Sequence, residues 1–507
     1  MSLSDQLLVD LNTALTNAGL TELPTPATVS STQDTRFGDY QTNIAMILAK
    51  IEKANPRELA QRVVDHFPKD SISETPEIAG PGFINFRIKS AVYGKALEAI
   101  AKDATNRCGL EPASAPQTIV LDFSAPNVAK PMHVGHIRST IIGDSLSRIA
   151  RFAGHNVITD NHIGDWGTQF GMIIHGWKTI LDESALEADP ITELLRVYKT
   201  VNEQCKENDA VRETCKGELV SLQAGNDENL GIWKRCVDLS IQGLQGIYGK
   251  LDVHFDHWLG ESAYNDRLAP LVTRLIDEDI AAESDGAICV FFPDIKALKD
   301  KPCLIRKADG GFLYATTDLA TIDFRVQEWN ADAIWYVVGA PQQLHFQQLF
   351  EVATQMGHET ELVHVAHGSI LGEDRKLMRT RSGENVQLSD VLDEAVERSR
   401  KIIEEKNPSL TDKEKSTISE VVGIGSVKFA ELSQHRMTDY VFSWDRMLAL
   451  TGDTAPYLQY SYVRIQSIFR KLELDETAVT NLLDSSQVNI GHDAETTLAR
   501  QIARFPE

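Results

Sequence analysis

Apolar and polar residues follow a strand, helix, strand pattern between residues 118 and 159. The run Thr118-Ile119-Val120-Leu121-Asp122-Phe123 is typical of a buried strand, and the Ser124-Ala125-Pro126-Asn127 that follows cannot continue a sheet. A helix is predicted next, because apolar residues recur at helical spacing as far as Gly154: Ile137, Ile141, Ile142, Leu146 and Ile149. Val157-Ile158-Thr159 predicts a second strand. This β-α-β pattern indicates a parallel sheet.

Two histidines stand where the first strand gives way to the helix. His133 and His136 are three residues apart, so both can face one ligand, and Gly135 between them lets a backbone come close. Ligands of parallel sheets bind beyond the carboxyl ends of the strands, where the free amides and dipole of a helix start favour an anion. The junction therefore predicts a nucleotide phosphate site, although such a pair taken alone is more often a local cap or a surface group.

The rest of the chain changes its pattern twice. Residues 1–112 read as a small α/β domain, residues 113–400 alternate strands with helices, and residues 401–507 are helical. A polar helical insertion interrupts the middle region at about 185–260. Further strands are predicted at 287–292, 303–306, 311–315, 333–338 and 362–366.

Composition limits the class of protein. The chain has 507 residues, enough for three or four domains, with no apolar run of membrane-spanning length and no basic leader at its start. Its six cysteines show no paired or metal-ligand spacing, so we expect reduced thiols, no structural metal and a cytoplasmic protein. The formal net charge of −23 argues against a nucleic-acid partner, but it leaves room for local basic patches.

Two longer strings resemble the arginyl-tRNA synthetases, a family of class I aminoacyl-tRNA synthetases. They are residues 127–140, NVAKPMHVGHIRST, and residues 162–171, HIGDWGTQFG. The resemblance extends to residues 37–43, FGDYQTN, and 80–85, GPGFIN. It implies an α/β fold in which 113–400 form a Rossmann-like catalytic domain with a parallel sheet. It also implies that 1–112 are an α/β domain contacting the tRNA elbow and that 401–507 are a helical anticodon-binding domain.

The C-terminal region departs from the family. Residues 452–460, GDTAPYLQY, resemble the start of the helical domain, which in the family runs further than Glu507. We therefore expect either a fragment or a curtailed domain.

The resemblance implies ATP-dependent activation of L-arginine and its transfer to tRNA(Arg). The implied catalytic residues are His133, His136, Lys130, Arg379 and Arg381. The second family signature, usually KMSKS, is matched by residues 377–383, LMRTRSG, with Met378 at the first lysine and Arg381 at the second. Lys130 matches a lysine that members lacking the second signature lysine carry before the histidines. A basic loop is otherwise ordinarily just solvated.

A guanidinium substrate requires carboxylates that can accept its paired donors. Tyr314 and Asp318 are four residues apart and share a face if a helix begins there, although Asp318 is also a plausible helix-start acid. The positions that match the family's arginine site are Asp122, Asn127, Tyr314, Asp318 and Gln342. The positions expected to bind ATP, besides the two histidines, are Gly135, Gly164, Asp165, Gln169, His367 and Gly368.

Contact with tRNA is implied for four residues: Phe37, Asp39, Tyr460 and Arg464. Phe37 also fits a core aromatic, and Arg464 fits a solvated helix face. We expect a monomer, with Mg²⁺ accompanying ATP and no metal site of the protein's own.

Two other functions stay open at this point. A nucleotidylyltransferase shares the HxGH strand-helix device, but the Tyr314 to Asp318 segment and the N-terminal domain speak against it. A paralogue or fragment that binds ATP and arginine without charging tRNA is the other alternative.

Overall fold

The computed structural model describes residues 2–372, 374–376, 378, 386–485 and 487–507. The chain forms two compact units, one of residues 1–113 with 465–507 and one of residues 114–464. The boundary near 113 lies close to the predicted one. The division into domains at 1–112, 113–400 and 401–507 stays a prediction.

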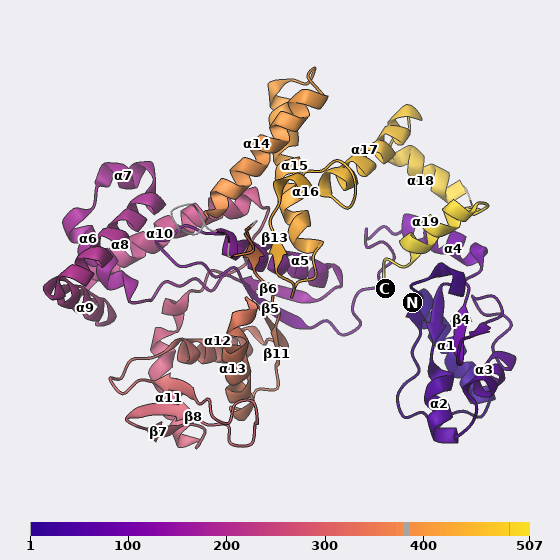
Figure 1. Cartoon of the computed structure of the whole chain (residues 1–507), viewed down its shortest axis with the longest axis horizontal. Helices are drawn as coiled ribbons and strands as arrows, with labels where there is room; N and C mark the ends of the chain where they lie inside the picture. The colour runs from indigo at the N-terminus through magenta and orange to yellow at the C-terminus, as the bar shows by residue number, and fades with distance from the viewer. Residues whose placement is uncertain (1, 373, 377, 379–385, 486) are drawn as a thin grey trace. The chain divides into compact units, whose positions relative to one another are not determined.

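A parallel four-stranded sheet lies at the centre of the larger unit (Figure 1). Its strands are β5 (Thr118–Phe123), β6 (Asn156–Asp160), β10 (Ala333–Val337) and β11 (Glu361–His364), in the order β11-β10-β5-β6. Asp122 is paired with Asp160 on one side and with Tyr336 on the other, so the carboxyl ends of three strands meet at one edge. The predicted α/β class with a parallel sheet is confirmed.

Side chains of β5 alternate between two hydrophobic cores, as expected for a strand covered on both faces. Ile119, Leu121 and Phe123 pack with Ile137 and Ile141 of α5 (Ile137–Phe152). Val120 points the other way, into the core formed with helices α11 (Asn265–Asp277), α12 (Tyr314–Trp329) and α13 (Gln343–Gln355). The predicted apolar face of α5 is wrong at one position, because Ile149 is 61% exposed.

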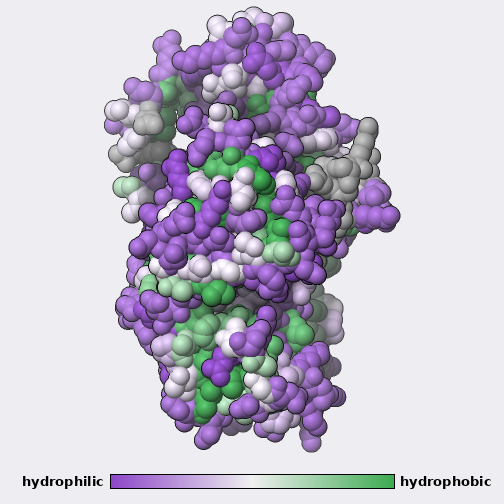
Figure 2. Space-filling view, turned by 90° about the vertical axis from the view of Figure 1, so that its left-hand side faces the viewer, coloured by the Kyte–Doolittle hydropathy of each residue, from purple (hydrophilic) through white to green (hydrophobic). Residues whose placement is uncertain are grey.

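The insertion is helical, as the sequence indicates. Its helices are α6 (Gln169–Ile180), α7 (Glu183–Ala188), α8 (Pro190–Glu207), α9 (Asp209–Gln223) and α10 (Asp227–Lys250). Asp189 caps α8 through its side chain, and Pro190 occupies the first turn, where a missing amide costs nothing. Figure 2 looks onto the left-hand side of Figure 1 and shows hydrophilic residues over most of that face, with smaller apolar patches between them.

A small antiparallel sheet follows the insertion. Its strands are β7 (Ala282–Ser284), β8 (Ala287–Val290) and β9 (Cys303–Arg306). Predicted strands at 287–292, 303–306, 333–338 and 362–366 have counterparts, but the strand predicted at 311–315 is wrong. Only Phe312 makes a single bridge, to Arg306, and α12 begins at Tyr314 because Ala315 and Leu319 bury their side chains in the core.

The later part of the unit is mainly helical. Its elements are η4 (Ala340–Gln342), β12 (Ile370–Leu371), α14 (Leu388–Lys406), α15 (Asp412–Leu432), β13 (Tyr440–Val441), α16 (Trp444–Met447) and α17 (Ala455–Lys471), the last of which runs past the unit boundary. The short strands β12 and β13 pair in parallel and form a separate two-stranded sheet, so the chain after α15 lies beside the segment that follows β11.

The smaller unit has its own antiparallel sheet, in the order β1-β2-β4-β3. Its elements are α1 (Leu3–Asn17), β1 (Ser30–Ser31), η1 (Thr35–Phe37), β2 (Tyr40–Thr42), α2 (Ile44–Glu52), α3 (Pro56–Asp65), β3 (Glu77–Ala79), β4 (Phe83–Phe86), α4 (Ser90–Ala101), α18 (Glu476–Ser485) and α19 (Asp493–Ala503). Leu7, Leu11 and Tyr40 form its core with Ala499 of α19.

Candidate active site

The turn between β5 and α5 has an unusual backbone. Ser124, Ala125 and Ala129 have φ angles of 74°, 44° and 59°, a region that non-glycine residues rarely adopt. The Ser124 amide donates to the hydroxyl of Ser139 at 2.8 Å, and that hydroxyl donates to the Val337 carbonyl at 2.6 Å. These bonds tie the ends of β5 and β10 to the first turn of α5. Strain of this kind is often stored where a ligand is bound.

The two signature histidines hold each other in place. The Gly135 amide donates to Nδ1 of His133, and the His133 amide donates to Nδ1 of His136, each at 3.1 Å. Their ring centroids are 4.0 Å apart, and a Cβ on Gly135 would come 2.8 Å from the His133 ring. Nδ1 of His133 accepts a hydrogen bond, so its neutral ring carries the proton on Nε2. Nδ1 of His136 also lies 3.2 Å from the His133 carbonyl, so its contacts are compatible with either neutral tautomer.

Burial keeps both rings uncharged at neutral pH. It lowers the pKa of His133 and lowers that of His136 to about 4, with a smaller contribution from the neighbouring ring. Each neutral ring therefore has one N–H group without bringing a positive charge of its own, and in His133 that group is Nε2–H. Donors of this kind suit phosphate oxygens whose charge changes during a reaction.

A cleft of about 590 Å³ lies beside the histidine pair, beyond the ends of β5 and β10. Five of the predicted ATP residues line it: His133, Gly135, His136, His367 and Gly368. His367 is buried, its Nδ1 lies 3.0 Å from the Gly368 carbonyl, and burial lowers its pKa. Gln342, predicted for arginine, lines the same cleft, as do Arg138, Gly339 and Met378, for which the sequence analysis made no contact prediction.

Three other predicted ATP residues do not line this cleft: Gly164, Asp165 and Gln169. Gly164 forms a single bridge with Asn127, and any Cβ on it would overlap the Asn127 amide oxygen. Asp165 is buried and accepts hydrogen bonds from the amide and hydroxyl of Ser262, at 2.8 and 2.6 Å. Its role in the described structure is to anchor the short helix η3 (Glu261–Tyr264).

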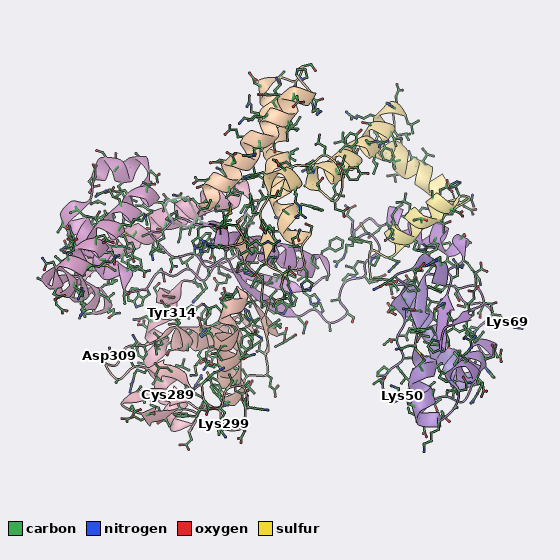
Figure 3. All side chains as sticks on the ribbon, in the orientation of Figure 1. Lys50, Lys69, Cys289, Lys299, Asp309 and Tyr314 are labelled. Atoms are coloured by element: carbon green, nitrogen blue, oxygen red, sulfur yellow. The ribbon has the colours of Figure 1, made fainter. Side chains whose placement is uncertain are left out.

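Two carboxyl groups, Asp318 of α12 and Glu261 of the 3-10 helix η3, belong to elements that pack against each other. Asp318 lies 2.6 Å from Nε2 of His345 on α13, and this contact raises the pKa of His345. Glu261 of η3 is close enough to Asp318 for the two charges to interact, and burial raises its pKa to about 7. Tyr314, one turn before Asp318, is 71% exposed (Figure 3). The predicted pair on the start of a helix is present.

Glu261 and His345 are two residues of this site that the sequence does not predict. Glu261 is the first residue of the single 3-10 turn η3, and His345 lies among the mixed residues of α13. Neither has a spacing or motif relation to Asp318. Only the packing of η3 and α13 beside α12 brings them there.

Asp122 has a partner inside the protein. Its carboxylate lies 2.7 Å from Nη2 of Arg325, which also lies 2.9 Å from Asp160, and all three side chains are buried. Burial raises the pKa of Asp122, opposed by the Arg325 charge. The predicted contact of Asp122 with an arginine substrate stays a prediction, and the carboxylate is already neutralised by a guanidinium of the chain.

The predicted basic residues are only partly described. Lys130 places Nζ 4.8 Å from the centroid of the Tyr198 ring. Arg379 and Arg381 lie outside the described residues. The pyrophosphate roles of all three stay predictions.

The predicted tRNA residues differ in exposure. Phe37 is 51% exposed, whereas Asp39 is 1% exposed, accepts the Ile88 amide at 2.7 Å and forms an ion pair with Arg500. The structure therefore gives Asp39 internal partners, which a contact with tRNA would have to break. Tyr460 and Arg464 are exposed on α17, with the guanidinium 5.8 Å from the tyrosine ring centroid.

Within the described part of the chain, no three His, Cys, Asp or Glu residues are grouped so as to hold a metal ion. The same part contains no helix with the length and apolar character needed to span a membrane.

Comparison with known proteins identifies two families of domain. Residues 101–444 match the family described as tRNA synthetases class I (R), catalytic domain, and residues 5–88 match the arginyl tRNA synthetase N terminal domain. Curated relatives include the arginine–tRNA ligases of Fusobacterium nucleatum, 41% identical over 488 residues, and Cellvibrio japonicus, 43% identical over 490 residues. Each alignment covers 95% of this chain and 83% of the relative.

Solved structures agree in fold. The arginyl-tRNA synthetase of Plasmodium falciparum matches with a TM-score of 0.82 at 25% identity, and that of Thermus thermophilus with 0.79 at 22%. Each match covers 99% of this chain and 86% of the solved one. The family models, the relatives and the parallel sheet with its histidine-lined cleft lead to one conclusion: this chain belongs to the arginyl-tRNA synthetase family of class I aminoacyl-tRNA synthetases.

Proposed function

We propose that the protein is an arginine–tRNA ligase. In the first step a carboxylate oxygen of L-arginine attacks the α-phosphorus of ATP, the bond to the β-phosphate oxygen breaks, and pyrophosphate leaves. In the second step a ribose hydroxyl at the 3′ end of tRNA(Arg) attacks the acyl carbon and AMP leaves. The observation that carries the proposal is a cleft lined by two neutral histidines beside a sheet whose neighbouring helix α12 presents Asp318, with Glu261 of η3 close enough to interact with it.

The histidines support the ATP end of the reaction. The rings of His133 and His136 stand at the start of α5, where the helix dipole favours an anion, and they are proposed to donate to phosphate oxygens as charge moves toward pyrophosphate. His367 and Gly368 supply the opposite wall of the cleft. Lys130, Arg379 and Arg381 are proposed to share the pyrophosphate charge.

The carboxyl groups support the arginine end. A guanidinium is planar, always charged and best matched by carboxylates that accept paired donors. Asp318 and Glu261 are proposed to accept them, because neither has an arginine of the chain as its partner in the described contacts. Tyr314, Asn127 and Gln342 are proposed to contact the rest of the amino acid.

Magnesium is proposed to arrive with ATP. The cleft lining offers hydroxyl and amide oxygens from Ser124, Ser369 and Gln342, but none of its described residues is a carboxylate. Mg²⁺ prefers carboxylates together with substrate phosphates, so the lining does not form a magnesium site by itself. The phosphates of ATP would supply the main ligands.

Phe37, Tyr460 and Arg464 are the proposed tRNA contacts that the structure leaves exposed. An aromatic ring and a guanidinium can stack on bases and reach phosphates even on a chain with net charge −23. We also propose a cytoplasmic monomer. Sedimentation of the pure protein with and without tRNA tests the oligomeric state.

Amino-acid-dependent exchange of pyrophosphate into ATP tests the function. Each common amino acid is assayed with and without tRNA(Arg), and transfer to tRNA is measured separately. We expect arginine alone to support exchange and charging. Pyrophosphate exchange supported by lysine or glutamine at comparable efficiency contradicts the substrate assignment. Pyrophosphate exchange without any amino acid indicates a nucleotidylyltransferase. Binding of ATP and arginine without charging of tRNA indicates a non-charging paralogue.

A further inference from the structure

Arg138 lies in the cleft wall but is turned toward the protein interior. It follows His136 by two residues in the first turn of α5, it lines the cleft, and only 1% of its surface is exposed. Its Nη1 donates to the Thr438 carbonyl at 2.9 Å, and its Nε lies 3.2 Å from the carboxylate of Glu431. The guanidinium also lies 5.4 Å from the centroid of the Tyr440 ring.

The groups that hold Arg138 belong to one stretch of chain, residues 431–441, which we call the linking segment. It begins at the end of α15 and ends in β13. Inside it the Tyr440 hydroxyl donates to Glu431, whose side chain is also 1% exposed. The linking segment thus presents a carbonyl, a carboxylate and a ring face to one guanidinium.

The same segment holds the opposite wall of the cleft. Nη1 of Arg436 donates to the Ala366 carbonyl at 2.6 Å, and the Gly368 amide donates to the Arg436 carbonyl at 2.8 Å. The Ser369 amide donates to the Asp439 carboxylate at 2.5 Å. A Cβ on Gly368 would meet the Thr438 backbone at 2.8 Å, so the two strands of chain are in close contact.

The histidine wall and the wall around Gly368 are therefore joined through the linking segment. Attraction within a buried ion pair is largely offset by the desolvation of both charges, so such a pair adds little net stability. The guanidinium is oriented by two contacts, the hydrogen bond from Nη1 to the Thr438 carbonyl and the packing against the Tyr440 ring. The Glu431 carboxylate, 3.2 Å from Nε without hydrogen-bond geometry, adds attraction across the same interface. The contacts of Arg138 thus restrict where the first turn of α5 can lie.

We propose that Arg138 is a positioning residue for adenylate formation. Through Glu431 and the linking segment, Arg138 sets the separation between the two walls of the ATP cleft. The inference rests on the proposed function for its kinetic consequence. Its structural consequence, the coupling of residues 133–138 to residues 366–371, does not depend on that function.

The test compares Glu431→Gln and Arg138→Lys with the wild type and with a matched control. Glu431→Gln keeps the shape and an oxygen for Tyr440 but removes the charge, and Arg138→Lys keeps the charge but loses the planar donors. The control, Asp323→Asn, breaks a partly buried pair with Arg274 between α11 and α12, and neither residue lines the cleft. Tyr440→Phe, which removes one hydroxyl, is the milder variant if the others fold poorly.

Two measurements are made on each folded protein. In arginine-dependent pyrophosphate exchange, Glu431→Gln and Arg138→Lys should each lose about tenfold or more in kcat/KM for ATP, with the KM for arginine changed by less than about twofold. In hydrogen exchange without substrates, both variants should exchange faster at residues 133–138 and at residues 366–371. Tyr440→Phe should shift both readouts in the same direction by a smaller amount. The control should leave both readouts at the wild-type level.

A purely structural role predicts a different result. A lower melting temperature with wild-type kcat/KM for ATP overturns the proposal. Faster hydrogen exchange confined to the linking segment also overturns it, as does an Arg138→Lys variant whose two readouts equal those of the wild type. If the wild-type protein shows no arginine-dependent pyrophosphate exchange, the proposed function is contradicted instead. Hydrogen exchange at residues 133–138 and 366–371 then tests the coupling of the two walls by itself.

Discussion

Arg325 reaches Asp122 across 203 residues of sequence, and its Nη2 lies 2.7 Å from the carboxylate inside the parallel sheet. Asp160 on the neighbouring strand accepts from the same nitrogen at 2.9 Å. An internal guanidinium therefore lies between two carboxylates at the edge of the sheet where the cleft opens. In this structure Asp122 therefore has a structural role, because its ion pair with Arg325 joins the sheet to α12.

Asp122→Asn should lower the free energy of unfolding by about 3 kcal/mol, because removing one partner of a buried ion pair leaves the other charge poorly compensated. Urea denaturation measures this change. Asp252→Asn is the control, since Asp252 is 71% exposed in its pair with Arg148 and its loss should cost about 1 kcal/mol or less. Equal stability losses for the two variants would show that the Asp122 pair has no special role in the fold.

Asp318→Asn should raise the KM for arginine much more than the KM for ATP. A charge-assisted hydrogen bond contributes about 1.5 to 3 kcal/mol, which corresponds to a change of roughly 10- to 150-fold. Steady-state exchange kinetics with each substrate varied in turn give the two constants. A parallel rise in both would count against the placement of Asp318 at the guanidinium. Glu261→Gln should behave in the same way.

His136→Ala should slow adenylate formation by about 100-fold, because it removes a donor aimed at developing phosphate charge. The KM for arginine should stay within about twofold of the wild type, since the proposed contact of the ring is with phosphate and not with arginine. Rapid-quench measurement of the first turnover separates this step from transfer. His254→Ala, a change at a side chain that is 80% exposed, serves as the control. A fully active His136→Ala enzyme would exclude the phosphate role.

The pKa of His136 predicts how stability depends on pH. Its folded value is about 4 and its ordinary value is 6.5, so between these two pH values the unfolded chain binds the proton and the folded chain does not. The contribution of His136 to the free energy of unfolding is therefore fully present above about pH 6.5. As the pH falls from 6.5 toward 4, the free energy of unfolding decreases by at most roughly 3 kcal/mol. Denaturation of the wild type and of His136→Gln between pH 7 and 4 isolates it. Identical pH profiles for the two proteins would contradict the low pKa.

Lys130→Ala should reduce the activation rate. If Lys130 and Arg381 stabilise the same pyrophosphate charge, the double variant should lose less than the sum of the single losses, as groups that act together do. Lys206→Ala is the control, since Lys206 is 61% exposed in the insertion and its removal should cost at most about 0.5 kcal/mol. A silent Lys130→Ala would leave its contact with Tyr198 as a packing interaction.

The sequence by itself determined the features that depend on neighbouring residues. β5, the start of α5 and β6 follow from apolar periodicity and from the break at residues 124–127, since strands and helices bury faces of fixed period. The same local reasoning predicted the histidine pair at the junction. At 311–315 it predicted a strand, and the shared face of Tyr314 and Asp318 was conditional on a helix that the structure then showed. The exposed Ile149 shows its limit, because periodicity does not say how wide the covered face is.

Only the tertiary structure decided which charges remain available to a ligand. Asp122 and Asp39 look equivalent to Asp318 in a sequence, yet Arg325 and Arg500 neutralise the first two, and Asp318 faces Glu261 and His345 instead. The physical reason is that electrostatic pairing depends on distance in space and on burial, and neither follows a period along the chain. The ion pair of Arg138 with Glu431 has the same origin, since it forms only when α15 packs against α5.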